Sequence, residues 1–121
     1  FPLDVEAMQE AGQYLVGTHD FKSFCASKTQ VQTTVRTVTG IEVETHSLSE
    51  GEYPSQKVII RVTGEGFLYN MVRIISGTLI KVGLGVYPPE HVKQILEACD
   101  RSQAGETVPA KGLFLKKIEY L

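Results

Sequence analysis

The stretch Gly64–Gly85, GEGFLYNMVRIISGTLIKVGLG, decides the fold of this chain. It begins with a Gly-x-Gly turn directly after the β-rich run Lys57–Thr63, and an amphipathic helix is predicted to begin at about Phe67. The residues of its predicted buried face recur at the i, i+4, i+7, i+8 spacing. They are Phe67, Met71, Ile74, Ile75, Thr78, Leu79 and Val82. The pattern therefore predicts a long, largely buried helix that ends in the glycines Gly83 and Gly85.

The other side of this helix carries Asn70, Arg73 and Gly77, again spaced three and four residues apart. Two interpretations of Arg73 fit that spacing. It is an ordinary surface cation on the solvent side of the helix, or it faces an acidic group or an anionic ligand. A charged side chain is seldom fully buried without a partner. The spacing alone leaves both interpretations open.

Two further helices are predicted, one on each side of this stretch. The first runs from about Asp4 to Val16, with Asp4 as its N-cap and Gly17 just past its end. Its predicted buried stripe is Val5, Met8, Gly12, Leu15 and Val16. The second opens at Pro88–Pro89 and continues to about Asp100, because proline is well tolerated in a first helical turn.

The remaining segments alternate between polar loops and strands. His19–Thr34 is predicted as a loop anchored by Phe21 and Phe24. Val35–Thr45 and Lys57–Thr63 show strand alternation on either side of a short polar loop, which predicts an antiparallel hairpin. The predicted inner face of the first strand is Val35, Thr39, Ile41 and Val43.

The C-terminal part is predicted to be a polar loop, Arg101–Lys111, followed by a final strand, Leu113–Tyr120. Helices and strands do not alternate as in a parallel βαβ array. We therefore predict one α+β domain over residues 1–121, an antiparallel sheet with helices packed on one face and the other face free.

Composition favours a cytoplasmic, metal-free protein. The chain has 121 residues and 42% hydrophobic composition, which suits one globular domain. It has no apolar run of membrane-spanning length and no signal peptide. Cys25 and Cys99 lie far apart without a C-x-x-C pattern, and the three histidines make no ligand spacing. Cys99 is expected in the core and Cys25 in a partly exposed loop.

The net charge of −2 argues mildly against nucleic-acid binding, but the charges are unevenly distributed. No acidic residue lies between Phe21 and Ile41, whereas Lys22, Lys28 and Arg36 do. Lysines also gather near the C-terminus, at Lys111, Lys116 and Lys117. A domain with one mildly basic face and a solvated surface of mixed charge both fit this distribution.

The Gly64-Glu65-Gly66 turn resembles a phosphate-binding loop only superficially. Amides at a helix N-terminus do attract anions. However, the third glycine of a dinucleotide fingerprint and the lysine of a Walker motif are missing. We expect a tight turn that lets the chain reverse into the helix and that could also contact an RNA phosphate. We expect no nucleotide cofactor.

Four blocks resemble, in order, the tRNA pseudouridine synthases of the TruA type. They are DVEAMQEAGQYLVGTHDFKSF, TTVRTV at Thr33–Val38, FLYNMVRIISGTLIKVGLG, and AKGLFLKKIEY near the C-terminus. The resemblance covers nearly the whole chain and matches the C-terminal half of such an enzyme. It implies half of a pseudouridine synthase fold, in which the sheet continues into the other half of the enzyme and the cleft between the halves holds RNA.

The resemblance also implies roles for individual residues. Arg73, in its Met-Val-Arg context, would pair with the catalytic aspartate of the other half and keep it ionised. Gly112 and Leu113 would line the uracil pocket, with Asn70 and Tyr69 as further substrate-binding candidates. The candidates for RNA phosphates are Lys22, Lys28, Arg36 and Lys111. At Cys25, where many relatives carry an arginine, one RNA contact would be absent.

The family's nucleophile lies in an Arg-x-Asp-x-Gly-like motif, and none of Asp4, Asp20 and Asp100 has that context. The resemblance therefore implies an inactive fragment of an enzyme that isomerises uridine in the tRNA anticodon stem-loop, at tRNA positions 38 to 40. It implies tRNA as substrate, a homodimer, and no cofactor or metal. The alternative is a non-catalytic α+β RNA-binding or assembly module, in which Arg73 makes a structural ion pair.

Overall fold

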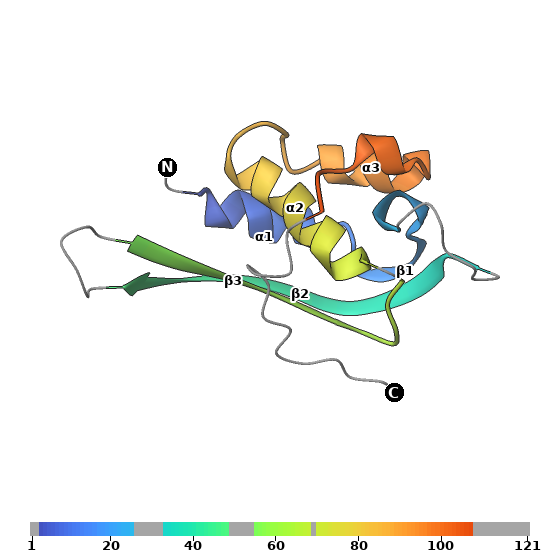
Figure 1. Ribbon diagram of the computed structural model, residues 1–121, viewed down its shortest axis with the longest axis horizontal. Helices are drawn as coiled ribbons and strands as arrows, with labels where there is room; N and C mark the ends of the chain where they lie inside the picture. The colour runs from blue at the N-terminus through green and yellow to red at the C-terminus, as the bar shows by residue number, and fades with distance from the viewer. Residues whose placement is uncertain (1–2, 26–32, 49–54, 69, 108–121) are drawn as a thin grey trace.

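The computed structural model describes residues 3–25, 33–48, 55–68 and 70–107. These residues form an antiparallel sheet of strand order β1-β2-β3 with helices on one of its faces (Figure 1). The strands are β1 (Gly17–Asp20), β2 (Val35–Leu48) and β3 (Ser55–Gly64), and the helices are α1 (Val5–Gln13), α2 (Met71–Gly83) and α3 (His91–Ala98). Short 3₁₀ turns lie at η1 (Lys22–Phe24) and η2 (Arg101–Gln103). The predicted α+β class is confirmed, while the predicted strand Leu113–Tyr120 lies outside the described residues.

The β2–β3 hairpin forms as predicted, but a bulge changes which residues face the core. The register shifts between Val38 and Gly40. As a result Val38 and Ile41, three residues apart, are both buried, and Val43 follows on the same face. Val35, predicted on the inner face, is 45% exposed. That assignment was wrong because strict alternation cannot be carried across a bulge.

Strand β1 was missed by the sequence pattern. It begins at Gly17, predicted just past the first helix, and enters the predicted loop His19–Thr34. It pairs with β2 from Gly17↔Val38 to Asp20↔Val35. Gly-Thr-His-Asp has no apolar alternation to mark a strand, so only its backbone pairing identifies it. Phe21, which follows it, and Phe24 are fully buried, which confirms their predicted anchoring role.

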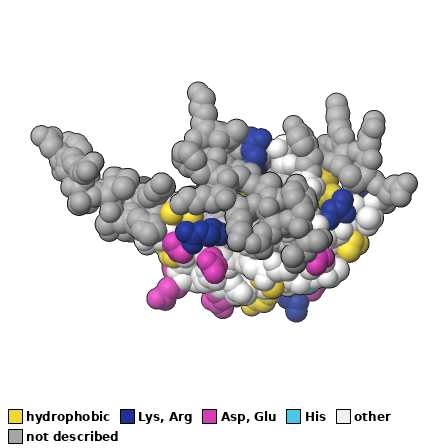
Figure 2. All heavy atoms as spheres, turned by 90° about the horizontal axis from the view of Figure 1, so that it is seen from below, with side chains coloured by type: hydrophobic (Ala, Val, Ile, Leu, Met, Phe, Trp, Pro, Cys, Tyr) yellow, Lys and Arg dark blue, Asp and Glu magenta, His cyan; other side chains and the backbone are white. Residues whose placement is uncertain are grey.

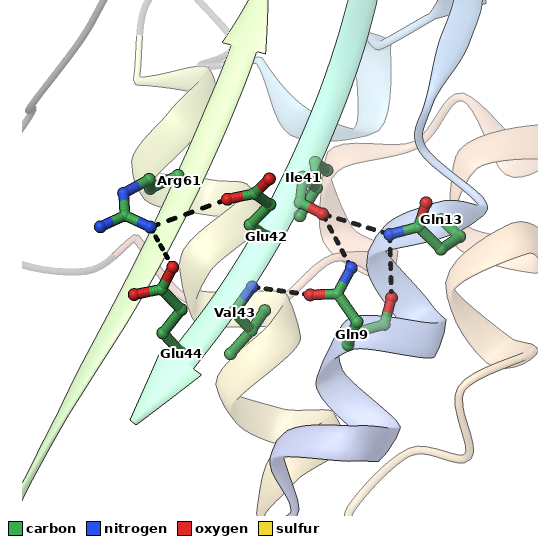
Figure 3. A network of polar contacts seen from close by, with 7 residues as sticks. All are labelled: Gln9, Gln13, Ile41, Glu42, Val43, Glu44 and Arg61. Carbon is green, nitrogen blue, oxygen red and sulfur yellow. Dashed lines mark hydrogen bonds and ion pairs between the residues drawn. The ribbon is translucent and has the colours of Figure 1, made fainter. Parts of the chain in front are cut away.

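Helix α1 closes the edge of β2 that β1 leaves uncovered (Figure 3). The Gln9 side-chain amide donates to the carbonyl oxygen of Ile41 at 2.9 Å and accepts from the backbone N–H of Val43 at 2.7 Å. Gln13 donates to the same Ile41 oxygen at 3.1 Å. Gln9 thus satisfies the strand edge as a neighbouring strand would. Asp4 caps the helix as predicted, by accepting from the backbone N–H of Ala7.

Helix α2 buries most of its predicted face but begins later than predicted. Met71, Ile74, Ile75, Thr78, Leu79 and Val82 are buried, and Phe67 is half-buried ahead of the helix. The helix begins at Met71 because the chain before it turns through positive φ at Gly66 (+133°) and Asn70 (+61°). The start at Phe67 was therefore wrong by one turn. No helix in the described ranges is long and apolar enough to cross a membrane.

The predicted environments of the two cysteines were reversed. Cys25 is buried at 5% exposure, because it directly follows the η1 turn that packs into the core. Cys99 is half-buried and takes φ +48° just past the end of α3, so the helix ends before the predicted Asp100. Cys25 and Cys99 are not joined by a disulfide.

The open face of the sheet carries charges of both signs. Arg61 on β3 makes an ion pair with Glu44 and lies 3.7 Å from Glu42, both on β2 (Figure 3). Acidic and basic side chains also lie near one another where Figure 2 shows the molecule from below. The Arg61 cation is thus balanced by carboxylates within the sheet.

Candidate functional site

The N-terminal end of α2 is held against the sheet by the turn that precedes it. The backbone N–H of Glu65 donates to the carbonyl oxygen of Thr37 on β2 at 3.0 Å. A Cβ at Gly64 would lie 2.6 Å from that same oxygen, so only glycine lets the two backbones come this close. The turn after β3 is therefore tight, as predicted, and it places the start of α2 at the end of the sheet where β2 begins (Figure 1).

Arg73 is half-buried on the first turn of α2, and Asn70 orients it. The Arg73 Nη1 donates to Asn70 Oδ1 at 3.0 Å. Asn70 occupies the N-cap position but makes no side-chain bond to a helix amide. Its amide oxygen binds the guanidinium instead of capping the helix. The spacing predicted a shared helix face for these residues but not this bond, which fixes one edge of the guanidinium near the helix N-terminus.

Gly77 lies on the Arg73 side of α2. Because it has no side chain, another segment of the same chain packs directly against the helix there. Backbone of the Gly105–Glu106 segment crosses the helix there, and a Cβ on Gly77 would lie 1.7 Å from the Glu106 carbonyl oxygen. Nothing in the sequence pattern predicts that a segment so distant in the chain lies at Gly77.

Two predicted phosphate contacts come to the same end of the sheet. His19 pairs across the strands with Arg36, and Lys22 follows β1 within two residues of Asp20. Lys22 is exposed, and Arg36 is half-buried with its Nη1 donating to the carbonyl oxygens of Thr33 and Val35. Arg36 directly precedes Thr37, which holds the turn before α2. The basic residues Lys22, Arg36 and Arg73 therefore come from one end of the domain.

The other predicted site residues, Tyr69, Lys28, Lys111, Gly112 and Leu113, lie outside the described residues. Within the described ranges, no group of three or more His, Cys, Asp or Glu side chains could hold a metal ion.

A pocket of about 310 Å³ lies elsewhere, between the end of α1, β1 and α3. Its lining residues are Tyr14, His19, Asp20, Lys93, Leu96, Glu97 and Cys99. None of the predicted site residues lines it. It carries both signs of charge, so it offers no uniform field for an anion.

Comparison with known proteins identifies the family. The model described as tRNA pseudouridine synthase matches residues 11–121. The tRNA pseudouridine synthase A of Brevibacillus brevis is 52% identical over 120 residues, which are 99% of this chain and 46% of that protein. The Bacillus subtilis enzyme of the same name is 48% identical over 120 residues, covering 99% of this chain and 45% of that protein. The tRNA pseudouridine synthase A 2 of Clostridium perfringens is 49% identical over 118 residues, covering 98% and 45%.

The chain thus spans about half the length of the curated relatives it matches. All three relatives are named as tRNA pseudouridine synthases. The family match, over residues 11–121, includes Asn70 and Arg73. This chain belongs to the tRNA pseudouridine synthase family.

Proposed function

We propose that this chain is the C-terminal half of a cytoplasmic, homodimeric tRNA pseudouridine synthase of the TruA type. The enzyme isomerises uridine in the anticodon stem-loop of tRNA. The reaction breaks the bond between N1 of uracil and C1′ of ribose, rotates the base, joins C5 to C1′, and releases the C5 proton. Family membership and the placement of Arg73 support this proposal.

The oriented guanidinium of Arg73 is the observation that carries the mechanism. The proposed nucleophile is an aspartate from the rest of the enzyme, and it must be ionised to attack. A guanidinium within a few ångströms lowers the pKa of a carboxyl group and so favours its charged form. Because Asn70 holds Nη1, Arg73 needs less reorganisation to face that aspartate. Lys22 and Arg36 would bind backbone phosphates at the same end of the domain.

The test uses the intact enzyme and tRNA that carries tritium at C5 of its uridines. Tritium release measures the isomerisation, and filter binding measures tRNA affinity. The proposal expects release with the wild-type enzyme, none with Arg73→Ala, and partial release with Arg73→Lys, while tRNA affinity stays nearly unchanged. Lys81→Ala removes a cation from the last turn of the same helix and should leave the rate intact.

Two results would contradict the proposal. Full tritium release with Arg73→Ala, or loss of folding without a specific defect in turnover, would assign Arg73 to a structural role. No release with the folded wild-type enzyme would favour the alternative, a non-catalytic RNA-binding or assembly module. An Arg-x-Asp-x-Gly motif elsewhere in the intact protein would argue for the enzyme.

A further inference from the structure

The loop after α2 holds two large aliphatic side chains outside the core. Leu84 is 51% exposed and Val86 is 57% exposed, with only Gly85 between them. Among the residues that the structure describes, the other exposed large hydrophobic side chain is Val35, on β2. One exposed aliphatic residue is ordinary on a protein surface, whereas neighbouring ones often mark a contact surface. Leu84 and Val86 are called the apolar pair below.

The backbone of this loop is fixed by hydrogen bonds. The N–H of Gly85 donates to the carbonyl oxygen of Val82 at 3.0 Å, and the N–H of Val86 donates to that of Lys81 at 2.9 Å. Gly85 takes φ +81°. These features form a Schellman motif, in which the residue at the Val86 position often packs against the one at the Lys81 position. Because a lysine occupies that position, Val86 stays exposed, and the motif presents the apolar pair in one defined geometry.

The beginning of the described chain lies beside the apolar pair. The backbone N–H of Asp4 donates to the carbonyl oxygen of Gly83 at 2.9 Å. A Cβ on Gly83 would lie 3.2 Å from Leu3 Cδ2, so the Leu3 side chain packs against the last residue of α2. Figure 1 shows α1 beginning at the end of α2 from which the loop to α3 leaves. A segment that joins the domain through Leu3 therefore joins it next to the apolar pair.

We propose that the apolar pair is a docking site for an apolar surface on the other half of the same enzyme. This chain covers 46% of the Brevibacillus brevis relative, so about half of such a protein lies outside it. In the proposed function this chain is the C-terminal half, and the other half joins it through Leu3, beside the pair. This continuity of the chain favours the other half over a second copy as the occupant. The inference rests on the proposed function.

Docking at the apolar pair would orient the other half toward Arg73. Helix α2 has 13 residues, and a rise of about 1.5 Å per residue places its ends about 20 Å apart. Arg73 lies at one end, where the proposed catalytic aspartate meets it, and the apolar pair lies at the other. A globular half of comparable length to this chain spans such a distance. Two contacts along one helix therefore set how the aspartate approaches Arg73.

Cysteine labelling of the intact enzyme tests whether the apolar pair is covered. Leu84→Cys and Val86→Cys each place a thiol at the docking site, and Lys93→Cys places one on α3, where the Lys93 side chain is 62% exposed. We expect maleimide to label both loop variants at least about 10-fold more slowly than Lys93→Cys, since a covered thiol reacts only when the contact opens. Peptide mass spectrometry separates these sites from Cys25 and Cys99. Equal rates at the three positions would overturn the inference.

Cross-linking identifies what covers the pair. Photo-leucine replaces leucine with a nearly isosteric diazirine, and peptide mapping selects the products formed from Leu84. Mixing enzyme labelled with ¹⁵N and unlabelled enzyme distinguishes links within one chain from links between chains. We expect links from Leu84 to the other half of the same chain. Links to a second copy, or to this domain alone, would overturn the inference.

Polar substitutions test the link to turnover. Leu84→Ser combined with Val86→Ser should lower kcat for tritium release about 10-fold, since a small misplacement of a reacting group has such an effect. Affinity for tRNA should stay within about two-fold, because the proposed phosphate contacts lie at the other end of α2. Leu84→Met combined with Val86→Ile keeps the pair apolar and should retain the wild-type rate.

The results distinguish failure of this inference from failure of the proposed function. Wild-type kcat in the double serine variant would overturn the role of docking in orienting the aspartate. Absence of tritium release by the wild-type enzyme would instead count against the proposed function. Labelling and cross-linking do not depend on activity, so they decide in either case whether the other half covers Leu84 and Val86.

Discussion

Asn70 contributes to the site through both its backbone conformation and its side chain. Its backbone takes the left-handed conformation at φ +61°, which glycine and asparagine tolerate better than other residues. Its side chain then binds Arg73 and leaves the helix N-terminus without a side-chain cap. The spacing of Asn70 and Arg73 in the sequence predicted that they share a helix face. It could not predict the left-handed turn, because nothing in the periodicity distinguishes an N-cap from a first-turn residue.

Substitutions at Asn70 separate these two roles. Asn70→Gly keeps the backbone conformation and loses the amide, whereas Asn70→Ala loses the amide and adds left-handed strain. We expect Asn70→Ala to be less stable than Asn70→Gly by about 1 kcal/mol in urea unfolding. Both should slow turnover of the intact enzyme to a similar extent, since both release the Arg73 guanidinium. Equal stability of the two variants would contradict the backbone argument.

Asp100 makes a local contribution that depends on pH. Hydrogen bonds from the side chain and then the backbone of Ser102 lower the pKa of the Asp100 carboxyl below its usual 3.8. A lowered pKa in the folded state adds stability that is present above pH 3.8 and is lost as the pH falls through the folded-state value. Thermal melts should therefore show a stability gap between wild type and Ser102→Ala at pH 7 that narrows as the pH falls below 3.8. A gap that is constant with pH would refute this assignment.

At the level of elements, α1 substitutes for a strand. The edge of β2 beyond β1 has backbone groups that would otherwise lack partners, and the Gln9 amide supplies both a donor and an acceptor (Figure 3). The helix comes this close because Gly12 has no side chain, and a Cβ there would lie 2.7 Å from Ile41 Cγ2. A glutamine on a predicted helix surface gives no sequence signal for such a role.

The Gln9 amide can be tested with an isosteric change. Gln9→Glu keeps the acceptor for the Val43 N–H but cannot donate to the Ile41 oxygen when ionised. We expect a loss of about 1 to 3 kcal/mol in unfolding free energy at pH 7, because a half-buried carbonyl then faces a carboxylate. Glu10→Gln, which changes the charge of the same helix by one unit in the opposite direction at an exposed position, serves as the control and should change the unfolding free energy less. An equal and opposite change at Glu10 would show that helix charge, not the edge bond, decides the effect.

The accuracy of sequence prediction differed between elements for physical reasons. The hairpin, the helical face of α2 and the Asp4 cap could be predicted because each depends on local pattern or local hydrogen bonding. Strand β1, the bulge near Gly40 and the crossing of α2 at Gly77 could not be predicted, because each is defined by a partner distant in the chain. Arg73 could be proposed from spacing and resemblance, whereas the polar loop that contains Gly105 and Glu106 carried no signal.

At the scale of the whole molecule, the net charge is −2, and the lysine and arginine side chains of the described residues are unevenly distributed. Lys22, Arg36 and Arg73 come from the end of the domain where β2 begins and α2 starts (Figure 1). Arg61 is balanced by Glu42 and Glu44 on the open sheet face. Attraction to RNA phosphates should therefore arise at that one end and be opposed by the rest of the surface.

This arrangement predicts weak, salt-sensitive RNA binding by the isolated domain. If Lys22 and Arg36 each neutralise about one phosphate, the logarithm of the binding constant should fall against the logarithm of salt with a slope of about −1 to −2. Fluorescence anisotropy with a labelled anticodon stem-loop measures that slope. Lys22→Ala should reduce its magnitude by about 1, whereas Lys93→Ala on α3 should leave it unchanged. Tight binding that persists at high salt, or an equal effect of both lysines, would show that RNA binds elsewhere on the domain.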